Sequence, residues 1–452
     1  MKILLLHNRY RYRGGEDIAV EQELALLQEH GHDVRLLLEH NDAFSGIAGA
    51  VSAACSAVYS ARSRRRVADE LRAFRPDVVH VHNFFPLLSP SAYLACSKAS
   101  VPVLQTLHNY RLICPGTNLF RDGRPCEDCV GRSVPWPGVL HGCYRDSRTG
   151  TAAVAAMIGI HNALKTWSHA VDAYIALTEF ARRKLIAGGL PAEKLHVKPN
   201  FITPDPGEGP GDGGYALFVG RLSEGKGIDV LLDAWKLLET KIPLVIVGEG
   251  PMASKVASIA RTIDADYRGP LSRPEVTECM RRASLLVFPS VWYEAFPLVI
   301  AEALACGLPV LVSDAGSAAE LIDNGRTGLH FRSGDPKDLA ARVESLWRDQ
   351  VLLGRIRREA RAEYEAQYKS ERNYTRLMQI YGQVLDQKKE AGGAKERWAP
   401  VALENKAFEE VRSNRGNCGG LVELVPGHGR NILATTRSAS QRRVQGTRGE
   451  EK

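Results

Sequence analysis

Short apolar runs alternate with segments of helical spacing along most of the chain. In the first half, residues 2–8 (KILLLHN) have the pattern of a buried strand, and residues 18–32 have the spacing of an amphipathic helix. Further strand-like runs cover residues 33–38, 76–83, 102–109, 173–178 and 195–201. The same alternation begins again at residues 215–220 and continues through a helix at 227–239 and strands at 243–248, 283–290 and 309–314. It predicts doubly wound α/β domains with parallel sheets.

A segment dense in proline and glycine separates the two halves. Residues 202–214 (ITPDPGEGPGDGG) therefore predict a linker between an N-terminal domain, 1–201, and a C-terminal domain, 215–368. Two such halves predict two Rossmann-like domains that face a cleft. Ligands are expected to bind in this cleft, beyond the carboxyl ends of the strands. Helical spacing continues to about residue 387, whereas residues 388–452 lack periodicity and predict a disordered tail with at most a short helix near 403–411.

Charge and apolar length exclude two classes of protein. The net charge is +7. Residues 388–452 contain 13 basic and 8 acidic residues and carry +5 of this charge, so residues 1–387 carry only +2. A nearly neutral body does not indicate a nucleic-acid-binding protein. The apolar run at residues 3–6 is too short for a signal peptide, and residues 43–60 are too polar for a membrane span. We therefore expect a cytoplasmic protein whose nine cysteines are reduced.

The first candidate site lies in VWYEAFPLVIAEALACG, residues 291–307. Pro297 suits the start of a helix, which leaves the amides of Leu298, Val299 and Ile300 free at its positive end. That arrangement binds anions, and it places Glu294 in the preceding loop and Glu302 in the second turn. Acids beside an anion site suit a nucleotide sugar, which carries phosphates and hydroxyls. The alternative is that the two acids only stabilise the helix start and carry surface charge.

Two further stretches predict contacts with phosphate. Arg221 and Lys226, in GRLSEGKG, follow a strand and could converge on a diphosphate, although a solvated turn has the same composition. Gly14 and Gly15 precede a helix and would let backbone approach a phosphate or sugar closely.

These stretches occur in an order that resembles a known family. The motifs are GGE at 14–16, TLHNY around His108, KPNF with Asn200, GRLSEGKG, VGEGP, RGPLS and PSVWYEAFPLVIAEALACGLPV. Together they resemble the retaining GT-B glycosyltransferases of family 4, which carry a Glu-x7-Glu motif, over roughly residues 1–386. The resemblance departs at Ala295 and Ser317, where glycine is common.

The resemblance implies hexose transfer from a nucleotide-diphosphate sugar to a hydroxyl of a glycan, lipid-linked or small-molecule acceptor, with retention and without a cofactor. It implies that a last helix, 369–387, crosses back to the first domain. The implied roles are donor-diphosphate binding for Arg221, Lys226 and Gly15, ribose binding for Glu302, and contact with the transferred sugar for Glu294 and His108. His80 and His82 are packing or acceptor-side residues. An epimerase or phosphorylase on the same fold is the alternative.

Competing signals are weaker. Gly248-x-Gly250-x-x-Ala253 follows a strand like a dinucleotide fingerprint, but Pro251 interrupts the turn and Asp264 and Asp266 come too early. Asp264 and Asp266 fit a surface turn better than a metal pair, so we infer no catalytic metal.

A loop at residues 114–143 contains Cys114, Cys126, Cys129 and Cys143, which form either a structural zinc site or four reduced thiols. Use of this loop for nucleic acid is disfavoured because its arginines are balanced by acids. Finally, the basic segment 60–74 indicates either peripheral contact with an anionic membrane at its inner face or the solvated side of a core helix.

Overall fold

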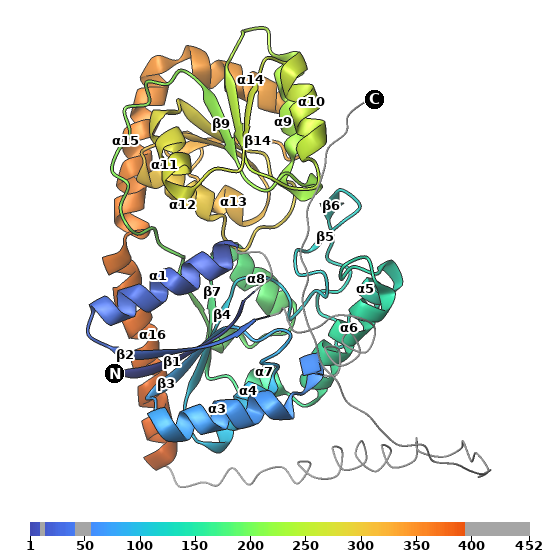
Figure 1. Ribbon diagram of the computed structural model, residues 1–452, viewed down its shortest axis with the longest axis vertical. Helices are drawn as coiled ribbons and strands as arrows, with labels where there is room; N and C mark the ends of the chain where they lie inside the picture. The colour runs from blue at the N-terminus through green and yellow to red at the C-terminus, as the bar shows by residue number, and fades with distance from the viewer. Residues whose placement is uncertain (10–13, 41–55, 394–452) are drawn as a thin grey trace, which may run out of the picture. The chain divides into compact units, whose positions relative to one another are not determined.

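The computed structural model describes residues 1–9, 14–40 and 56–393, and this part of the chain contains two six-stranded parallel sheets (Figure 1). The first sheet has the order β2-β1-β3-β4-β7-β8, and the second has the order β11-β10-β9-β12-β13-β14. The strands of the first are β1 Lys2–Arg9, β2 Asp33–His40, β3 Val78–Asn83, β4 Val103–Leu107, β7 Ala173–Ala176 and β8 Leu195–Val197. Those of the second are β9 Ala216–Val219, β10 Leu244–Val247, β11 Asp266–Gly269, β12 Leu285–Phe288, β13 Val310–Ser313 and β14 Gly328–Phe331.

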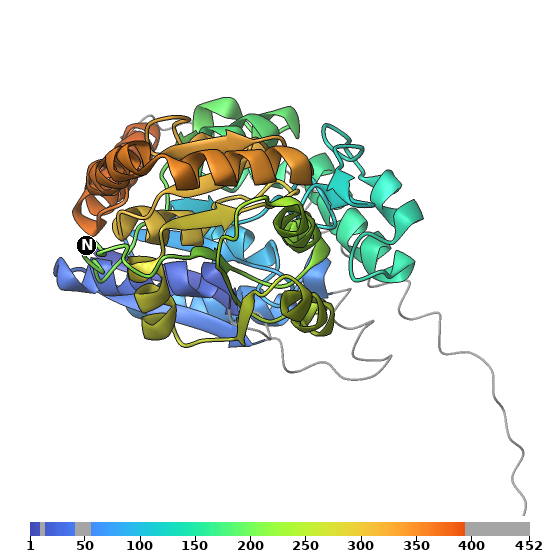
Figure 2. The ribbon, with the colours of Figure 1, turned by 90° about the horizontal axis from the view of Figure 1, so that it is seen from above.

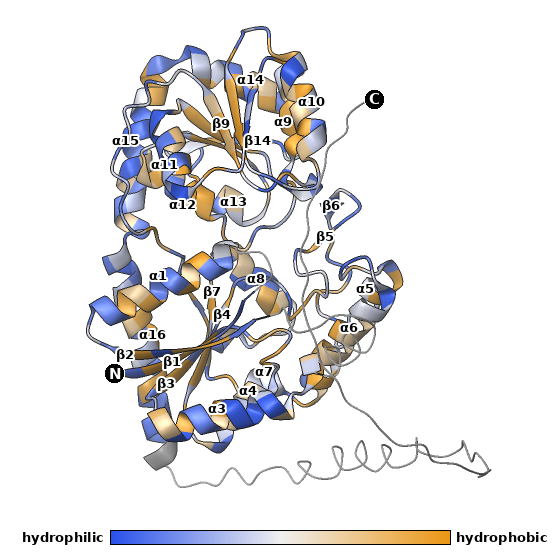
Figure 3. Ribbon diagram, in the orientation of Figure 1, coloured by the Kyte–Doolittle hydropathy of each residue, from blue (hydrophilic) through white to orange (hydrophobic). Residues whose placement is uncertain are grey.

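The central strands form because they are apolar on both faces. Leu4, Leu5 and Leu6 of β1 are fully buried, as expected where helices cover both sides of a parallel sheet (Figure 3). In order of appearance within its half, the second sheet reads 3-2-1-4-5-6 and the first reads 2-1-3-4-5-6, both doubly wound orders. The prediction of two Rossmann-like domains is confirmed.

Helices connect the strands and cover the sheets. In the first half they are α1 Gly15–Glu29, α3 Ala61–Phe74, α4 Ser91–Lys98, α5 Trp136–His141, α6 Arg148–Ala163, α7 Thr166–His169 and α8 Glu179–Ala187. In the second half they are α9 Ile228–Leu237, α10 Ala253–Thr262, α11 Arg273–Arg282, α12 Leu298–Ala305, α13 Gly316–Leu321, α14 Pro336–Arg348 and α15 Gln350–Gln367. Figure 2 shows helices on the two faces of the sheets.

Four strands were not predicted from the sequence, among them the edge strand β14. The segment that begins at Asp266, interpreted from the sequence as a surface turn, is the edge strand β11, whose residues alternate between exposed and half-buried. An antiparallel hairpin of β5 Phe120–Arg121 and β6 Arg124–Pro125 stands apart in the cysteine-containing loop. Short or exposed strands lack the apolar run that marks a buried one.

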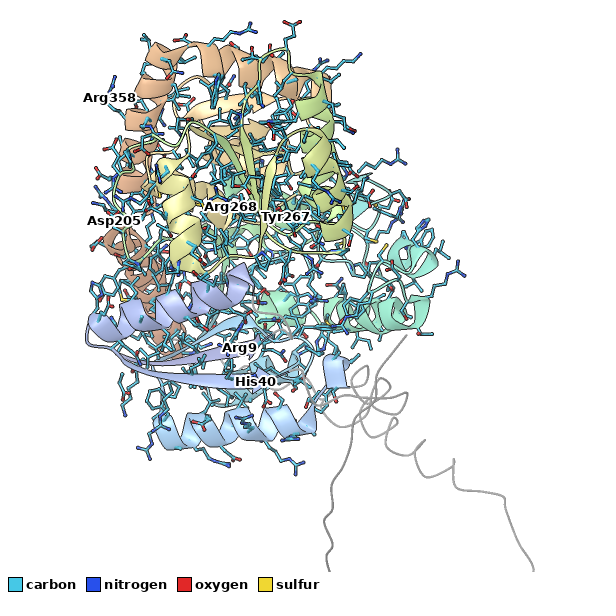
Figure 4. All side chains as sticks on the ribbon, turned by 45° about the horizontal axis from the view of Figure 1, so that its top comes forward. Arg9, His40, Asp205, Tyr267, Arg268 and Arg358 are labelled. Carbon is cyan, nitrogen blue, oxygen red and sulfur yellow. The ribbon has the colours of Figure 1, made fainter. Side chains whose placement is uncertain are left out.

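Residues 198–215 connect β8 to β9 without helix or strand. Asp205 of this segment, labelled in Figure 4, accepts hydrogen bonds from Arg361 Nη1 and Nη2, both at 2.8 Å. The bidentate contact holds the connection against α15.

The last described helix, α16 Ser370–Gly393, returns to the first sheet (Figure 1). Its Leu377 and Tyr381 share a buried cluster with Ile3, Leu5 and Val78 of β1 and β3. The helix continues to Gly393, so the prediction of disorder is wrong for residues 388–393; the rest of the predicted tail, including its short helix, lies outside the described residues. No helix in the described ranges is long and apolar enough to cross a membrane.

Candidate active site

The order of the second sheet brings Lys226 and Glu294 together. β9 and β12 are neighbours although two strands separate them in sequence, so the loops after their carboxyl ends meet at the switch point of the sheet. Lys226 comes from the loop after β9 and Glu294 from the loop after β12, and Lys226 Nζ lies 2.6 Å from Glu294 Oε1. Sequence analysis had assigned these residues to different parts of a ligand.

Further groups fix the Glu294 carboxylate in place. Its Oε1 also accepts hydrogen bonds from Ser290 Oγ, at 3.1 Å, and from Trp292 Nε1. The Lys226 ammonium lies over the Trp292 ring, 5.5 Å from its centroid. Gly225 has to be small because a Cβ there would lie 2.5 Å from the Trp292 ring. The sequence analysis missed Trp292 and Ser290, although both lie within four residues of Glu294.

Helix α12 begins beside this pair, with Pro297 as its N-cap. The Ile300 amide donates to the Pro297 carbonyl at 3.0 Å, so the prediction that it is free for a ligand is wrong. The amides of Leu298 and Val299 have no acceptor among the hydrogen bonds of the described residues. Glu302 lies in the second turn, where burial raises the pKa of its carboxyl while Arg273, with Nη2 3.7 Å away, opposes that rise.

Arg221 is exposed and lies two residues beyond the end of β9. The ion pairs of the described residues include none of its own. Its guanidinium therefore remains available to a ligand at the same strand end as Lys226.

The first domain meets α12 through a glycine. Gly14 is the N-cap of α1, and its amide donates to Asp17 Oδ2 at 2.9 Å. A Cβ on Gly15 would lie 3.1 Å from Leu298 Cδ1, so the start of α1 lies directly against the start of α12. Bare backbone at Gly15 is therefore adjacent to the candidate anion site.

Hydrogen bonds also join the domains near Glu294. Tyr110 Oη donates to the Glu294 carbonyl at 3.3 Å. Thr178 Oγ1 and Ser317 Oγ are 2.8 Å apart. Ser317, a departure from the family pattern, thus supplies an interdomain contact that glycine could not make.

His108 follows β4 and is connected to a buried polar network. Its Nε2 lies 3.0 Å from Nδ1 of His82, and Nε2 of His82 lies 3.3 Å from Oε1 of Glu23. Burial, followed by the neighbouring His82, lowers the pKa of His108 well below its ordinary value. Burial likewise lowers the pKa of His82 to about 4. Both rings are therefore neutral near pH 7.

The network extends to the returning helix α16. Lys198 Nζ lies 3.0 Å from Glu23 Oε2 and 2.9 Å from Asn373 Oδ1. Nδ1 of His80 lies 2.8 Å from the hydroxyl of Tyr381. Sequence analysis missed Glu23 and Lys198, because an acid within a helix and a lysine at a strand end normally face solvent.

Glu23, His80 and His82 are the one trio of potential metal ligands in the described ranges whose atoms lie within 4.8 Å of one another. The Lys198 ammonium already neutralises the Glu23 carboxylate, with Nζ 3.0 Å from Oε2, and its positive charge would repel a cation bound by this trio.

The four loop cysteines influence one another electrostatically but do not form such a trio. Tetrahedral zinc with Zn–S bonds of about 2.3 Å would require sulfurs roughly 3.8 Å apart. Burial raises the pKa of Cys129 to about 12, which favours the protonated thiol. Of the two alternatives, we expect four reduced thiols rather than a zinc site.

We therefore expect purified protein to contain less than stoichiometric zinc by elemental analysis. Titration of the denatured protein under anaerobic conditions should count all nine cysteines as free thiols. One zinc per chain, removed by chelation with loss of folding, would contradict this expectation.

The glycines of the dinucleotide-like stretch have a packing role. A Cβ on Gly248 would lie 1.9 Å from the Gly220 carbonyl oxygen, and its φ is +142°. The loops after β9 and β10 approach each other too closely there for a side chain.

Helix α3 buries one face of the basic segment 60–74. Val67, Leu71 and Phe74 lie in the core, while Arg64, Arg72 and Arg75 line a surface groove of about 610 Å³ between α3 and α4. Contact of this surface with a membrane stays a prediction.

Comparisons with known proteins agree with this architecture. Residues 13–206 match the family "Glycosyltransferase Family 4", and residues 204–365 match "Glycosyl transferases group 1". Together the two matches span residues 13–365, and both family models describe glycosyltransferases.

Relatives of this chain include several named enzymes. It is 29% identical to a glycogen synthase of Mycobacterium tuberculosis over 69% of each chain. It is 26% identical to a D-inositol 3-phosphate glycosyltransferase of an Arthrobacter species, over 63% of this chain and 66% of that one.

Solved structures share the fold at low sequence identity. A glycosyltransferase from Rickettsia africae has a TM-score of 0.62 at 15% identity and covers 85% of this chain and 98% of its own. Anabaena HepE in complex with UDP has a TM-score of 0.59 at 17% identity and covers 86% of this chain and all of its own. These GT-B structures agree with the predicted fold class.

Proposed function

We propose that this glycosyltransferase moves a hexose from a nucleotide-diphosphate sugar to a hydroxyl acceptor with retention of the anomeric configuration. The contact of Lys226 with Glu294 at the switch point carries the proposal, because a cation and an acid held together there suit a ligand with both phosphate and hydroxyl groups. HepE, which shares this fold, has been crystallised with UDP and with UDP-glucose, which supports a donor of this class.

The donor would lie across the second sheet. Lys226, Arg221 and the Leu298 and Val299 amides would bind the diphosphate and stabilise the charge that grows on it as the sugar leaves. Glu302 would accept hydrogen bonds from ribose hydroxyls, and Glu294 from hydroxyls of the sugar. Gly15 would let the first domain approach the phosphates, and His108 would face the sugar from that side.

A thermal-shift screen tests the donor class. Nucleoside diphosphates and their sugars raise the unfolding temperature in proportion to ln(1 + [L]/Kd), so the screen ranks both base and sugar. With the best donor, release of nucleoside diphosphate on addition of a hydroxyl acceptor, and the anomeric coupling constant of the product, test transfer and retention. Hydrolysis without transfer, or dependence on inorganic phosphate, would instead indicate an epimerase or a phosphorylase.

Lys226→Ala is expected to weaken nucleoside diphosphate binding about 10- to 100-fold, because a charged hydrogen bond contributes roughly 1.5–3 kcal/mol. Isothermal titration measures the change. Lys236→Ala removes an exposed lysine of α9 that pairs only with Asp233, and it should leave the affinity unchanged. Equal affinity in Lys226→Ala and the unmodified protein would remove Lys226 from the donor site.

A further inference from the structure

Arg111 is a buried cation whose in-plane hydrogen-bonding groups are unpaired. Its residue is 7% exposed, and its Nε and Nη1 atoms are shielded from solvent without a hydrogen-bond partner. The guanidinium lies over the Phe85 ring, 4.0 Å from the centroid, and 5.6 Å from that of Tyr144. Aromatic contacts satisfy the faces of a guanidinium, but its N–H groups point outward in its plane and still require acceptors. Leaving them buried and unpaired is costly.

Glu16 is the acid that faces this cation without touching it. Its Oε1 is also shielded and unpaired, and Arg111 and Glu16 interact electrostatically. Ion pairs within 4.0 Å among the described residues do not include this pair. Asn83 and Asn109 hydrogen-bond to the Glu16 carboxyl. Its Oε1 and the Nε and Nη1 atoms of Arg111 nevertheless remain without partners on the two sides of the gap.

The first sheet explains why these groups meet beside His108. β1, β3 and β4 are consecutive neighbours; Asn83 is the last residue of β3, and Glu16 and Arg111 follow β1 and β4 respectively. His82, His108 and Arg111 line one small cavity of about 20 Å³, which has room for one oxygen atom of a larger group. The location is on the opposite domain from Lys226, Arg221 and α12, which leaves it to the acceptor when the donor lies across the second sheet as proposed.

We propose that Arg111 and Glu16 form an acceptor subsite, an inference that rests on the proposed function. The subsite would bind an anionic group of the acceptor, either a carboxylate or a phosphate. Two N–H groups of Arg111 would donate to the oxyanion, and the aromatic rings hold the guanidinium in position for a bidentate contact. The Glu16 carboxyl would donate its proton to the same group.

The protonation of Glu16 agrees with this assignment. Burial, followed by Asp17, raises the pKa of Glu16 to about 8, against the opposing effect of Arg111. At pH 7 such a carboxyl is mostly neutral, and the ion pairs of the described residues include none for Arg111. An anion restores neutrality, whereas a sugar hydroxyl would not.

Matched probes test the subsite in the full-length protein. The diphosphate site is first saturated with the nucleoside diphosphate that gives the largest thermal shift. Isothermal titration then compares glucuronate with glucose, and glycerol 1-phosphate with glycerol. We expect one charged probe to bind at least about tenfold more tightly than its neutral partner, and the two pairs distinguish carboxylate from phosphate.

Arg111→Met should abolish that preference while nucleoside diphosphate binding remains. Arg111→Lys should retain part of the preference, because lysine keeps the positive charge but cannot make the bidentate contact. This variant also controls for loss of folding. Arg132→Met removes an exposed arginine that lies over Trp136, in the same part of the domain, and should change nothing. A preference that persists in Arg111→Met, or no preference in the unmodified protein, overturns the inference. Absence of any nucleoside diphosphate binding would instead contradict the proposed function.

Discussion

Glu294→Gln is expected to reduce kcat/KM for sugar transfer roughly 10²- to 10³-fold, the size of effect that follows loss of one preorganised electrostatic group. The glutamine oxygen can still accept from Trp292 and Ser290, so the loop should keep its shape. The substitution removes only the negative charge that faces Lys226 and the proposed sugar. Initial rates of nucleoside diphosphate release, with and without acceptor, measure the change.

The matched control is Glu278→Gln, on the exposed side of α11. Its rates should equal those of the unmodified protein. If Glu294→Gln retains more than about a third of the activity and the same thermal midpoint, Glu294 does not contact the reacting sugar. A lower midpoint together with lost activity would show that Glu294 holds the loop in place, which the proposed function does not require.

The second large effect is on stability. Lys198→Met should lower the free energy of unfolding by roughly 3–5 kcal/mol, because it leaves the Glu23 carboxylate buried without its cation. Lys198 is 1% exposed and Glu23 is 4% exposed, so solvent cannot replace the lost partner. Chemical denaturation followed by circular dichroism measures the loss. Lys241→Met, which breaks an exposed pair with Asp264, is the control and should leave stability unchanged.

A double substitution separates the ion pair from simple packing. Lys198→Met with Glu23→Gln should lose less stability than Lys198→Met alone, because no uncompensated charge remains. If the two losses simply add, the ion pair does not stabilise this core.

The same pair predicts the dependence of stability on pH. Burial acts to raise the pKa of Glu23, but Lys198, followed by His80 and His82, holds it well below its ordinary value of 4.5. The stabilisation is therefore present above pH 4.5 and is lost as the pH falls through the folded-state value. His82 contributes in the same direction from pH 6.5 downward, because its unfolded form takes up a proton that the buried ring resists. In Lys198→Met, the free energy of unfolding should therefore fall less steeply with decreasing pH below pH 4.5 than in the unmodified protein.

Much of the architecture was accessible from the sequence. The central strands of parallel sheets are covered on both faces, so β1, β9 and β12 contain uninterrupted apolar runs. β11 and β14 were missed because both lie at sheet edges and lack such a run: β11 alternates between exposed and half-buried residues, and β14 is only half-buried in its middle. The extension of α16 beyond residue 387 was missed because the apolar spacing that marks its packing against the first sheet ends near Val384.

The sequence by itself determined which residue types follow which strands, including Lys226, Glu294 and His108. Only the tertiary structure decided which of those strands are neighbours, and hence that Lys226 touches Glu294 and that Glu16 faces Arg111. Periodicity reports the burial of each segment against some surface, but not the order in which the segments pair. That order depends on contacts between residues far apart in the chain, which no local pattern records.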